Sequence, residues 1–287
     1  MDLFRVMPIN RLRQIAKERT LAFVSSRVFN DDPWEAMLVR ALLRNDGIKD
    51  VADILLEQGD ISALPGLIEA ARNADASAYL QCWTKTSEHN LMWDRYGDGN
   101  DAVRVRMSNA GRANLPAWIT FFEARYEDAF DIRQELRHLA SESEVTVSSI
   151  IMMNFGGDAA PNQQFNNTVI DFRKSMTFKL AAYRHENEVR LMTPIHNPGM
   201  SRDNQRNPSP WWNNPSGSKD VTLLPIGEIA NIVAGVMAGP SASDSLQREL
   251  EALCKSEKIQ YEGKSTLRTE RYTGSTRIFN YDPNENS

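Results

Sequence analysis

The chain has 287 residues, of which 41% are hydrophobic and 25% are charged, and its formal net charge is −5. This is ordinary globular usage, and the chain is long enough to bury a core without covalent cross-links. The mildly acidic balance excludes a general attraction to phosphate backbones, so any contact with nucleic acid has to be local.

The sequence also predicts a soluble, cytoplasmic protein with no membrane association. Cys82 and Cys254 are too few and too far apart for a disulfide framework or a zinc site. The N-terminus lacks the apolar core of a signal peptide. The longest apolar runs, such as Leu115–Phe122 and Ile229–Ala238, fall far short of the roughly 20 residues that span a bilayer.

The first half of the chain mixes helical and strand-like patterns. In chain order these patterns predict a helix at 9–19, a short strand at Leu21–Val24, an Asn/Asp/Pro turn at Phe29–Glu35, mostly helix over 34–74, a strand at Ala78–Thr84, a turn at Met92–Gly97 and a half-exposed strand at Val103–Met107. Helix and strand are therefore interspersed rather than segregated.

The second half has the same mixture, interrupted by two polar loops. The predicted elements are a long helix at 117–140, a loop at 154–168, extended structure at 177–192, a loop insertion at 197–220, a helix from Ser241 or Ser243 to about Lys258, a turn at Gly263–Thr266 and a frayed tail. Neither loop is flanked by a sharp change in composition. We therefore expect one α+β domain over residues 1–287.

The sequence lacks the residue spacing of common cofactor-binding and metal-binding motifs. Gly263-Lys264-Ser265 lacks the glycine that a phosphate-binding loop needs five residues earlier, where Lys258 stands. No strand is followed by a Gly-x-Gly-x-x-Gly motif, so a Rossmann unit is unsupported. The four histidines have no metal-ligand spacing, and we expect no metal.

Four charged residues alternate between positions 184 and 190. If this stretch is a strand, Arg184, Glu186, Glu188 and Arg190 share one face. One interpretation is a solvated face whose charges pair with each other, and periodicity alone favours it. The other is a catalytic pair of carboxylates that stabilises an oxocarbenium-like transition state, as in glycosyl chemistry.

Several short motifs, taken in order, resemble a bacterial family, domain of unknown function twenty-nine seventy-one. The motifs are Leu3-Phe4-Arg5, Phe29–Glu35, Cys82-Trp83-Thr84, Met92–Gly97, Lys179–Arg190 and Ala238-Gly239-Pro240. The resemblance runs from about residue 3 to about residue 270. The chain departs from the family's pattern at Asp32, which is an extra residue in the Asn-Asp-Pro turn, and at 197–220, which looks like an insertion.

The order of these motifs is also similar to the ADP-ribosyltransferase fold, with its split β-sheet core and surrounding helices. Those enzymes have an arginine on a first strand, a Ser/Thr-aromatic-Ser/Thr strand and a late Glu-x-Glu. The matching positions are Arg5, Thr84 with Trp83, and Glu186 with Glu188.

The resemblance implies NAD as co-substrate and a role for each matching residue. Arg5 would hold the pyrophosphate through charge-assisted contacts. Thr84 would bond the ribose or support Glu188. Glu188 would stabilise the sugar cation as nicotinamide leaves, and Glu186 would orient or deprotonate the acceptor. From sequence alone, an ordinary strand position is an equally good interpretation of Arg5 and of Thr84.

Aromatic residues supply the remaining candidates. Trp93 and Tyr96 would stack on the nicotinamide or wall the cleft, and core packing is an alternative that suits Trp93 better than Tyr96. Trp83 is a further cofactor-binding candidate, beside Tyr96. In loop 197–220, Trp211 and Trp212 lie near Arg202 and Arg206, a combination that suits single-stranded nucleic acid. A disordered insertion whose tryptophans pack on the body stays open.

The leading hypothesis is therefore an NAD-dependent mono-ADP-ribosyltransferase that modifies RNA or DNA, or else protein. Such an enzyme would be a bacterial toxin or phage-defence effector restrained by an antitoxin protein. A non-catalytic interaction or sensor protein on the same scaffold is the alternative. A metal-dependent nucleic-acid hydrolase is the third reading, and the absence of ligand spacing makes it the weakest.

Overall fold

The computed structural model describes residues 1–25, 78–97, 101–117, 119–128, 174–193 and 221–267, with isolated positions at 39, 43, 68, 71, 72, 134 and 135. The turn predicted at 29–35, the loops at 154–168 and 197–220 and the end of the C-terminal tail lie outside these residues, as does nearly all of the helical region 34–74. None of the helices in the described part of the chain has the length and apolar content that crossing a bilayer requires.

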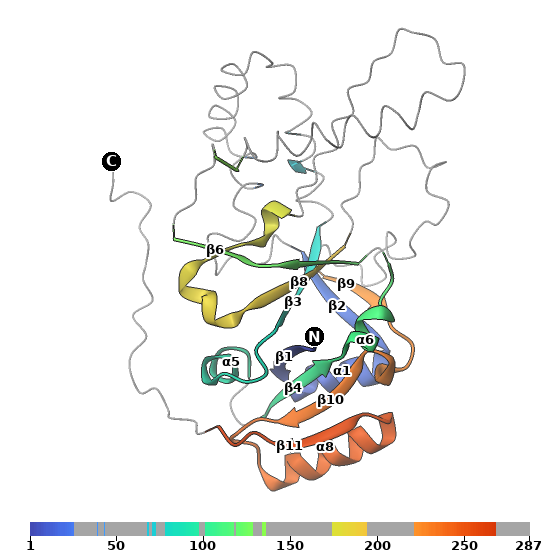
Figure 1. The fold of residues 1–287 in the computed structure, drawn as a ribbon. Coiled ribbons are helices and arrows are strands. Elements are labelled where there is room, and N and C mark those ends of the chain that lie inside the picture. Colours follow the sequence, from blue (N-terminus) through green and yellow to red (C-terminus); the bar gives the residue numbers. More distant parts are fainter. Residues whose placement is uncertain are drawn as a thin grey trace, which may run out of the picture.

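Strands outnumber helices in the described structure (Figure 1). They are β1 (Leu3–Pro8), β2 (Thr20–Ser25), β3 (Tyr79–Thr84), β4 (Ala102–Met107), β5 (Thr120–Glu123), β6 (Arg125–Glu127), β7 (Phe178–Leu180), β8 (Glu188–Met192), β9 (Val221–Pro225), β10 (Val233–Ala238) and β11 (Gln260–Lys264). The helices are α1 (Ile9–Glu18), α5 (Asn90–Tyr96), α6 (Asn109–Ala113) and α8 (Asp244–Glu257), with short 3-10 helices η4 (Lys174–Thr177), η5 (Ala181–Glu186) and η8 (Ile229–Asn231).

Nine of these strands form one mixed sheet in the order β11-β10-β4-β1-β3-β2-β9, with β8 between β3 and β5. Every pair in this sheet is antiparallel except β10–β11. A separate parallel pair joins β6 and β7. This mixture of a large sheet with several helices agrees with the predicted α+β class.

The sheet divides at β3. Along one edge, β3 pairs with β8 over its whole length from Leu80 to Thr84. The other edge is shared, because β2 pairs only near Leu80 and β1 meets β3 only at Thr84. The two half-sheets, β1-β4-β10-β11 and β2-β9, therefore diverge from the middle of β3 (Figure 1).

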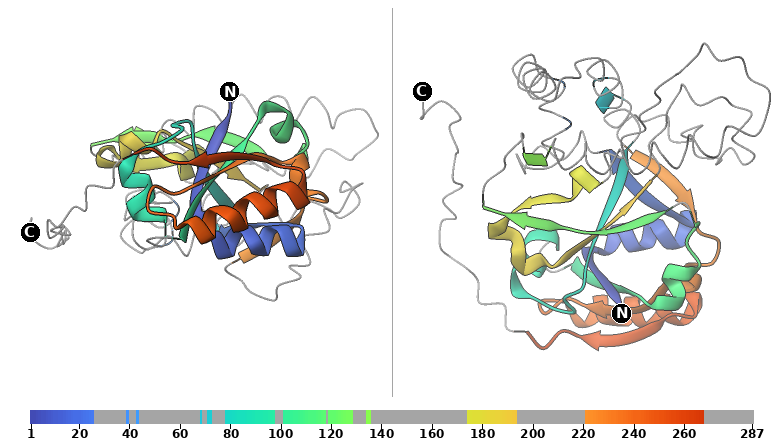
Figure 2. Two further views of the ribbon diagram at one scale, coloured as in Figure 1. Left: turned by 90° about the horizontal axis from the view of Figure 1, so that it is seen from below. Right: turned by 45° about the horizontal axis from the view of Figure 1, so that its top comes forward.

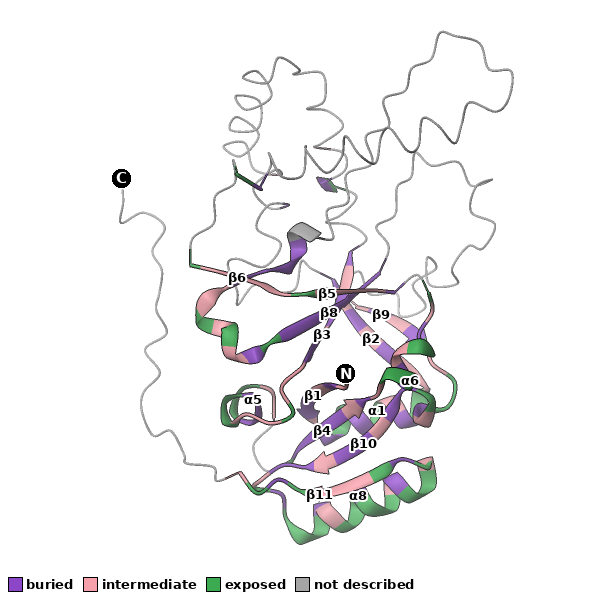
Figure 3. Ribbon diagram, in the orientation of Figure 1, coloured by how far each residue is buried: buried purple, intermediate pink, exposed green. Residues whose placement is uncertain are grey.

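Helices α1 and α8 cover one face of the sheet side by side (Figure 2). They bury Ile9, Leu12 and Ala16 from α1 and Leu246, Leu250 and Cys254 from α8 in the main core, while their outer faces are exposed (Figure 3). The spacing of three or four residues on each helix explains why one stripe is buried. Ser243 caps α8 by accepting a hydrogen bond from the Leu246 amide, as predicted.

The predicted helix at 117–140 is wrong over its first part, residues 120–127, whereas the described positions 134 and 135 are helical. Thr120–Glu123 is β5, whose residues pair with β8 from Met192 to Val189, and β6 follows at Arg125–Glu127. The β-branched and aromatic residues Thr120, Phe121 and Phe122 suit a strand, and pairing with a buried neighbour outweighs the helical pattern.

The prediction that 103–107 is half exposed is also wrong. β4 lies between β1 and β10, and Arg104 is buried. Its guanidinium donates to Glu262 at 2.5 Å, and the Nε of Arg106 donates to the same carboxylate at 2.6 Å. Ion pairs with Glu262 on β11 allow two arginines to lie within a central strand. The alternation of charged and apolar residues in β4 therefore does not mean that one face of the strand is exposed.

Two predicted turns prove to be regular elements. Met92–Gly97 is mostly the helix α5, capped by the His89 side chain, which accepts from the Leu91 amide. Trp93 is buried with Val6 and Ala102, as expected of core packing. The turn expected to lead into a strand at Gly263 is instead the end of β11, where Gly263 has a φ of 85°. Helix α5 packs against β1, beside the point where the sheet divides.

Candidate functional site

A cavity of about 610 Å³ occupies the place where β1 and β2 separate from β3. Its walls come from β1, α1, β2, β3, α5, β7, η5, β8 and β9. Six of the residues singled out from the sequence line it: Arg5, Trp83, Thr84, Tyr96, Glu186 and Glu188. The chain thus brings together residues that are up to 183 positions apart, from Arg5 to Glu188. A volume of this size is typical of sites for small molecules and cofactors.

The two glutamates do not share a strand face, so that prediction is wrong. Glu186 ends the 3-10 helix η5, Asn187 is in the left-handed region with a φ of 43°, and only from Glu188 is the chain a strand. Arg184 is exposed, whereas Glu186, Glu188 and Arg190 are buried. The left-handed residue reverses the chain direction, and this reversal brings the two carboxylates together despite their different backbone conformations.

Hydrogen bonds from three neighbours fix this reversal. The Thr84 hydroxyl donates to the backbone carbonyl of Glu186, and the Lys85 amide donates to the carbonyl of Asn187 at 3.0 Å. The Glu188 amide donates to the Tyr126 hydroxyl at 2.7 Å. Thr84 therefore supports the glutamate pair through Glu186, rather than through Glu188 as the resemblance implied.

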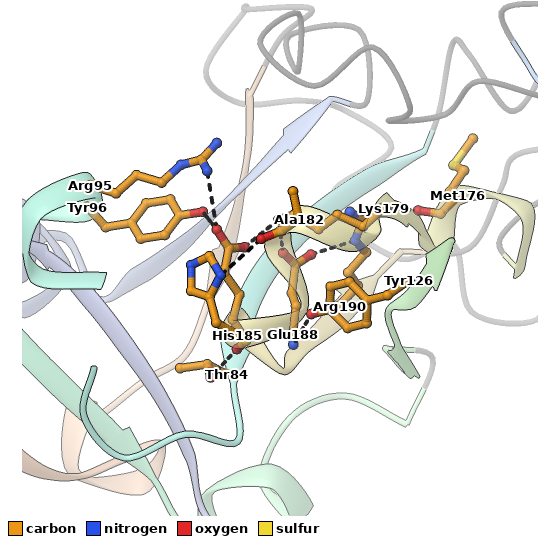
Figure 4. Close-up of polar contacts among 11 residues, drawn as sticks. Thr84, Arg95, Tyr96, Tyr126, Met176, Lys179, Ala182, His185, Glu188 and Arg190 are labelled. Atoms are coloured by element: carbon orange, nitrogen blue, oxygen red, sulfur yellow. Dashed lines mark hydrogen bonds and ion pairs between the residues drawn. The ribbon is translucent and has the colours of Figure 1, made fainter. Parts of the chain in front are cut away.

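Glu186 is held by residues of α5 and β7, and Figure 4 labels these partners, Arg95, Tyr96 and Lys179. The Tyr96 hydroxyl donates to its Oε1 at 2.9 Å, and the Arg95 guanidinium lies 3.5 Å from the same oxygen. The Lys179 ammonium donates to Oε2 at 2.5 Å. Burial raises the pKa of Tyr96, so this residue stays a neutral phenol and a hydrogen-bond donor.

Glu188 is held by two cations. Lys179 contacts its Oε2 at 2.5 Å, and the Arg190 Nε donates to its Oε1 at 2.6 Å. Arg190 is fully buried and also donates to the Met176 carbonyl. Burial by itself would raise the pKa of Glu188, but the charges and hydrogen bonds of Arg190 and Lys179 outweigh burial and lower it to about 2.

Lys179 was not assigned a role from the sequence, although it contacts both glutamates. It lies on β7, which pairs with β6 outside the main sheet, and it is 5% exposed. A lone lysine in an extended stretch carries no local signal of such a position. Only the packing of β7 against η5 and β8 reveals it.

Arg5 supplies a cation to the wall that β1 forms. Its side chain lines the cavity, and among the described residues none is within hydrogen-bonding distance of its guanidinium. Burial lowers the pKa of Arg5, against weaker favourable contributions from Cys82, Tyr96 and Glu188. A partly buried guanidinium without a protein partner is costly, and an anionic ligand would relieve that cost.

The remaining sequence-predicted residues divide into two groups. Trp83 is 3% exposed, belongs to the main core and donates its indole N–H to Gln81 at 2.8 Å, so it packs the wall rather than offering a stacking face. Trp211, Trp212, Arg202 and Arg206 lie outside the described residues. Within the described ranges, no group of three or more His, Cys, Asp or Glu side chains is placed to hold a metal ion.

Comparison of the chain with protein-family models, with curated protein sequences and with solved structures gives no match. The resemblance to the domain-of-unknown-function family and to the ADP-ribosyltransferases therefore stays a prediction from the quoted motifs.

The lowered pKa of Glu188 makes a prediction about stability. Because its folded pKa of about 2 is below the ordinary value of 4.5, this carboxylate stabilises the fold above about pH 4.5 and loses that effect as the pH falls toward 2. The contribution is about 3 kcal/mol. In urea unfolding, the stability difference between wild type and Glu188→Gln should shrink as the pH falls from about 5 to about 2. A difference that stays constant over this range would contradict the ion-pair assignment.

Proposed function

We propose that this chain is an NAD-dependent mono-ADP-ribosyltransferase whose co-substrate occupies the cavity at the division of the sheet. The observation that carries the proposal is the convergence of Arg5, Thr84, Tyr96, Glu186 and Glu188 on that one cavity. These residues come from β1, β3, α5, η5 and β8, and they are the residues that the sequence motifs predict for an NAD site.

Positive groups near the start of the chain favour the dinucleotide's pyrophosphate. Arg5 has no carboxylate or carbonyl partner among the described residues, and Pro8 and Arg11 also line the cavity. Helix α1 begins just after Pro8 with no side-chain cap and no acidic residue in its first turn. Its free amide groups and dipole add to the attraction for a phosphate group.

Glu188 and Glu186 would divide the chemistry at the ribose. The bond between ribose C1′ and the nicotinamide nitrogen breaks, and its electron pair leaves with neutral nicotinamide. Glu188, ionised at neutral pH, stabilises the positive charge that develops on the ribose. The acceptor nucleophile then bonds to C1′, and Glu186 takes the proton that it loses.

Thr84 and Tyr96 serve this chemistry as supports. Thr84 holds the Glu186 carbonyl, and Tyr96 holds the Glu186 carboxylate. Both therefore fix the direction in which Glu186 faces the cavity. The resemblance implied a contact with the ribose or support of Glu188 for Thr84, and a contact with the nicotinamide for Tyr96.

The acceptor is a macromolecule in this proposal, with RNA or DNA preferred over protein. That preference rests on the sequence of loop 197–220, where Trp211 and Trp212 accompany Arg202 and Arg206. An enzyme that modifies such a target would act as a bacterial toxin or phage-defence effector and would need a restraint such as an antitoxin protein.

One observation favours a second function, that of a non-catalytic sensor of an anionic ligand. Every oxygen of the two carboxylates already has a cationic or phenolic partner. Lys179, Arg190 and Arg95 also outnumber the two glutamates, which suits binding of an anion better than stabilisation of a cation. This reading predicts NAD binding without NAD cleavage.

Alkylation of Cys82 provides a test of NAD binding that does not depend on catalysis. Cys82 lines the cavity, whereas Cys254 is on the buried side of α8, in the main core. Only unoccupied protein can react at Cys82. At an NAD concentration about ten times its dissociation constant, the rate of modification by iodoacetamide should therefore fall about tenfold.

Mass spectrometry of the two cysteine peptides measures both rates in one sample. Protection by NAD and by ADP, with no change at Cys254, is the expected result. An unchanged Cys82 rate at millimolar NAD would remove the cavity as the binding site and the proposed function with it.

A further inference from the structure

We infer that Lys179 is a positioning residue that keeps Glu186 and Glu188 ionised together and at a fixed separation. The effect of Lys179 on catalysis rests on the proposed function. Its effect on the ionisation of the two glutamates does not. Nothing in the sequence motifs assigned Lys179 a role.

The Lys179 ammonium contacts both glutamates. Its Nζ lies 2.5 Å from Glu186 Oε2 and 2.5 Å from Glu188 Oε2. Two carboxylates that both touch one nitrogen are necessarily close neighbours. The Tyr183 ring lies 5.3 Å from the same nitrogen and covers it, so water has little access to replace the ammonium.

Both glutamates are buried. Glu186 is 2% exposed and Glu188 is 4% exposed. Two neighbouring carboxylates in such surroundings cannot both stay ionised without a cation between them, and one of them would retain a proton. Arg190 reaches only Glu188, and Arg95 reaches only Glu186. Among the described residues, Lys179 alone bridges the pair.

Other groups face the cluster from each neighbouring element. They are Arg5 on β1, Cys82 on β3, Arg95 and Tyr96 on α5, Tyr126 on β6 and Arg190 on β8. Burial raises the pKa of Tyr126 to about 12, and it raises that of Tyr96 further, so both phenols are neutral near neutral pH. Burial also lowers the pKa of Lys179, but Glu188, Tyr96 and Glu186 outweigh burial and the net change is upward. The lysine therefore stays a cation in the pH range of the test.

The roles of the two glutamates explain why this matters. Glu188 must be an anion to stabilise the ribose cation, and Glu186 must be an anion to accept the acceptor's proton. If Lys179 is replaced by Met, one of the two takes up a proton shared by the pair, and one of the roles is lost until the pH rises.

The first readout is the pH profile of nicotinamide release from NAD. In Lys179→Met, the acidic limb should move up by about one pH unit or more, so that the deficit is largest near pH 6 and narrows toward pH 9. Lys179→Arg should restore the wild-type limb. Lys85→Met is the matched control, because Lys85 pairs with the exposed Glu123 outside the cavity, and its profile should equal that of wild type.

The second readout needs no activity. Nuclear magnetic resonance of ¹³C-labelled glutamate, assigned with Glu186→Gln and Glu188→Gln, follows each carboxylate directly. In wild type Glu188 should remain ionised down to about pH 4, and in Lys179→Met one of the two carboxylates should titrate above about pH 5. If Lys179→Met does not fold, the titration of the wild-type protein still tests the role of Lys179.

Either of two results would overturn the role of Lys179. One is a wild-type titration in which Glu188 takes up its proton above about pH 5. The other is a Lys179→Met variant in which both carboxylates titrate as in wild type, or whose activity falls equally at every pH. A wild-type protein that never releases nicotinamide would instead count against the proposed function and would leave the resonance test of Lys179 intact.

Discussion

Replacing Glu188 by glutamine should lower the rate of nicotinamide release from NAD by about 10²–10³-fold, because a fixed charge at the developing ribose cation is lost. Glutamine keeps the size of the side chain and one carbonyl oxygen that can still accept from Arg190 or Lys179. The measurement is the initial rate at saturating NAD, with the dissociation constant for NAD determined separately. That constant should change far less than the rate, because Arg5 and the start of α1 are the groups proposed to hold the pyrophosphate.

Two further variants separate chemistry from folding. Glu188→Asp keeps the charge but draws it back from the ribose, so it should remain as stable as wild type within about 1–2 kcal/mol and still lose most of the activity. Glu123→Gln removes an exposed carboxylate on β5 and should change neither property. Wild-type activity in a folded Glu188→Gln protein would exclude this residue as the stabilising group.

Arg5→Gln should weaken NAD binding about 10–100-fold, because it removes a charge-assisted contact to the pyrophosphate. It should leave the free energy of unfolding unchanged or raise it, since the guanidinium has no partner among the described residues. A residue that mattered only for structure would show the opposite pattern. Calorimetric titration with NAD and urea unfolding of the same preparation measure the two quantities.

Arg13→Gln provides the control for Arg5. Arg13 lies on the exposed side of α1 and pairs with Glu249 on α8, so its loss should cost little stability and no affinity for NAD. If Arg5→Gln binds NAD as wild type does, the pyrophosphate site has to lie elsewhere.

Local patterns predicted the elements whose burial follows from their own spacing. α1 and α8 each have one apolar stripe that the core covers, and β3 is an apolar segment between polar ones. β5 escaped prediction because its Thr-Phe-Phe run fits a helix face as well as a strand. Its pairing with β8, which lies some 70 residues later in the chain, decided between the two.

In the candidate site, too, local sequence patterns predicted some features, and contacts between distant segments determined the others. Arg5, Glu186 and Glu188 were identified by their order along the chain, yet a strand was the wrong backbone for Glu186. The left-handed conformation of Asn187 determines how the glutamates meet, and asparagine only permits that conformation without requiring it. Lys179 was missed because its role depends on β7 folding back beside β8, which no spacing within the sequence encodes.

Incubation of the purified wild-type protein with NAD labelled in its adenylate phosphate, in separate reactions with RNA, DNA and protein pools, tests the central claim most directly. The proposed function predicts that label appears in a macromolecule, in RNA or DNA before protein, with an equal amount of nicotinamide released and with both signals lost in Glu188→Gln. Intact NAD in every reaction, under conditions in which NAD protects Cys82 from alkylation, would contradict transferase activity and would favour the non-catalytic sensor.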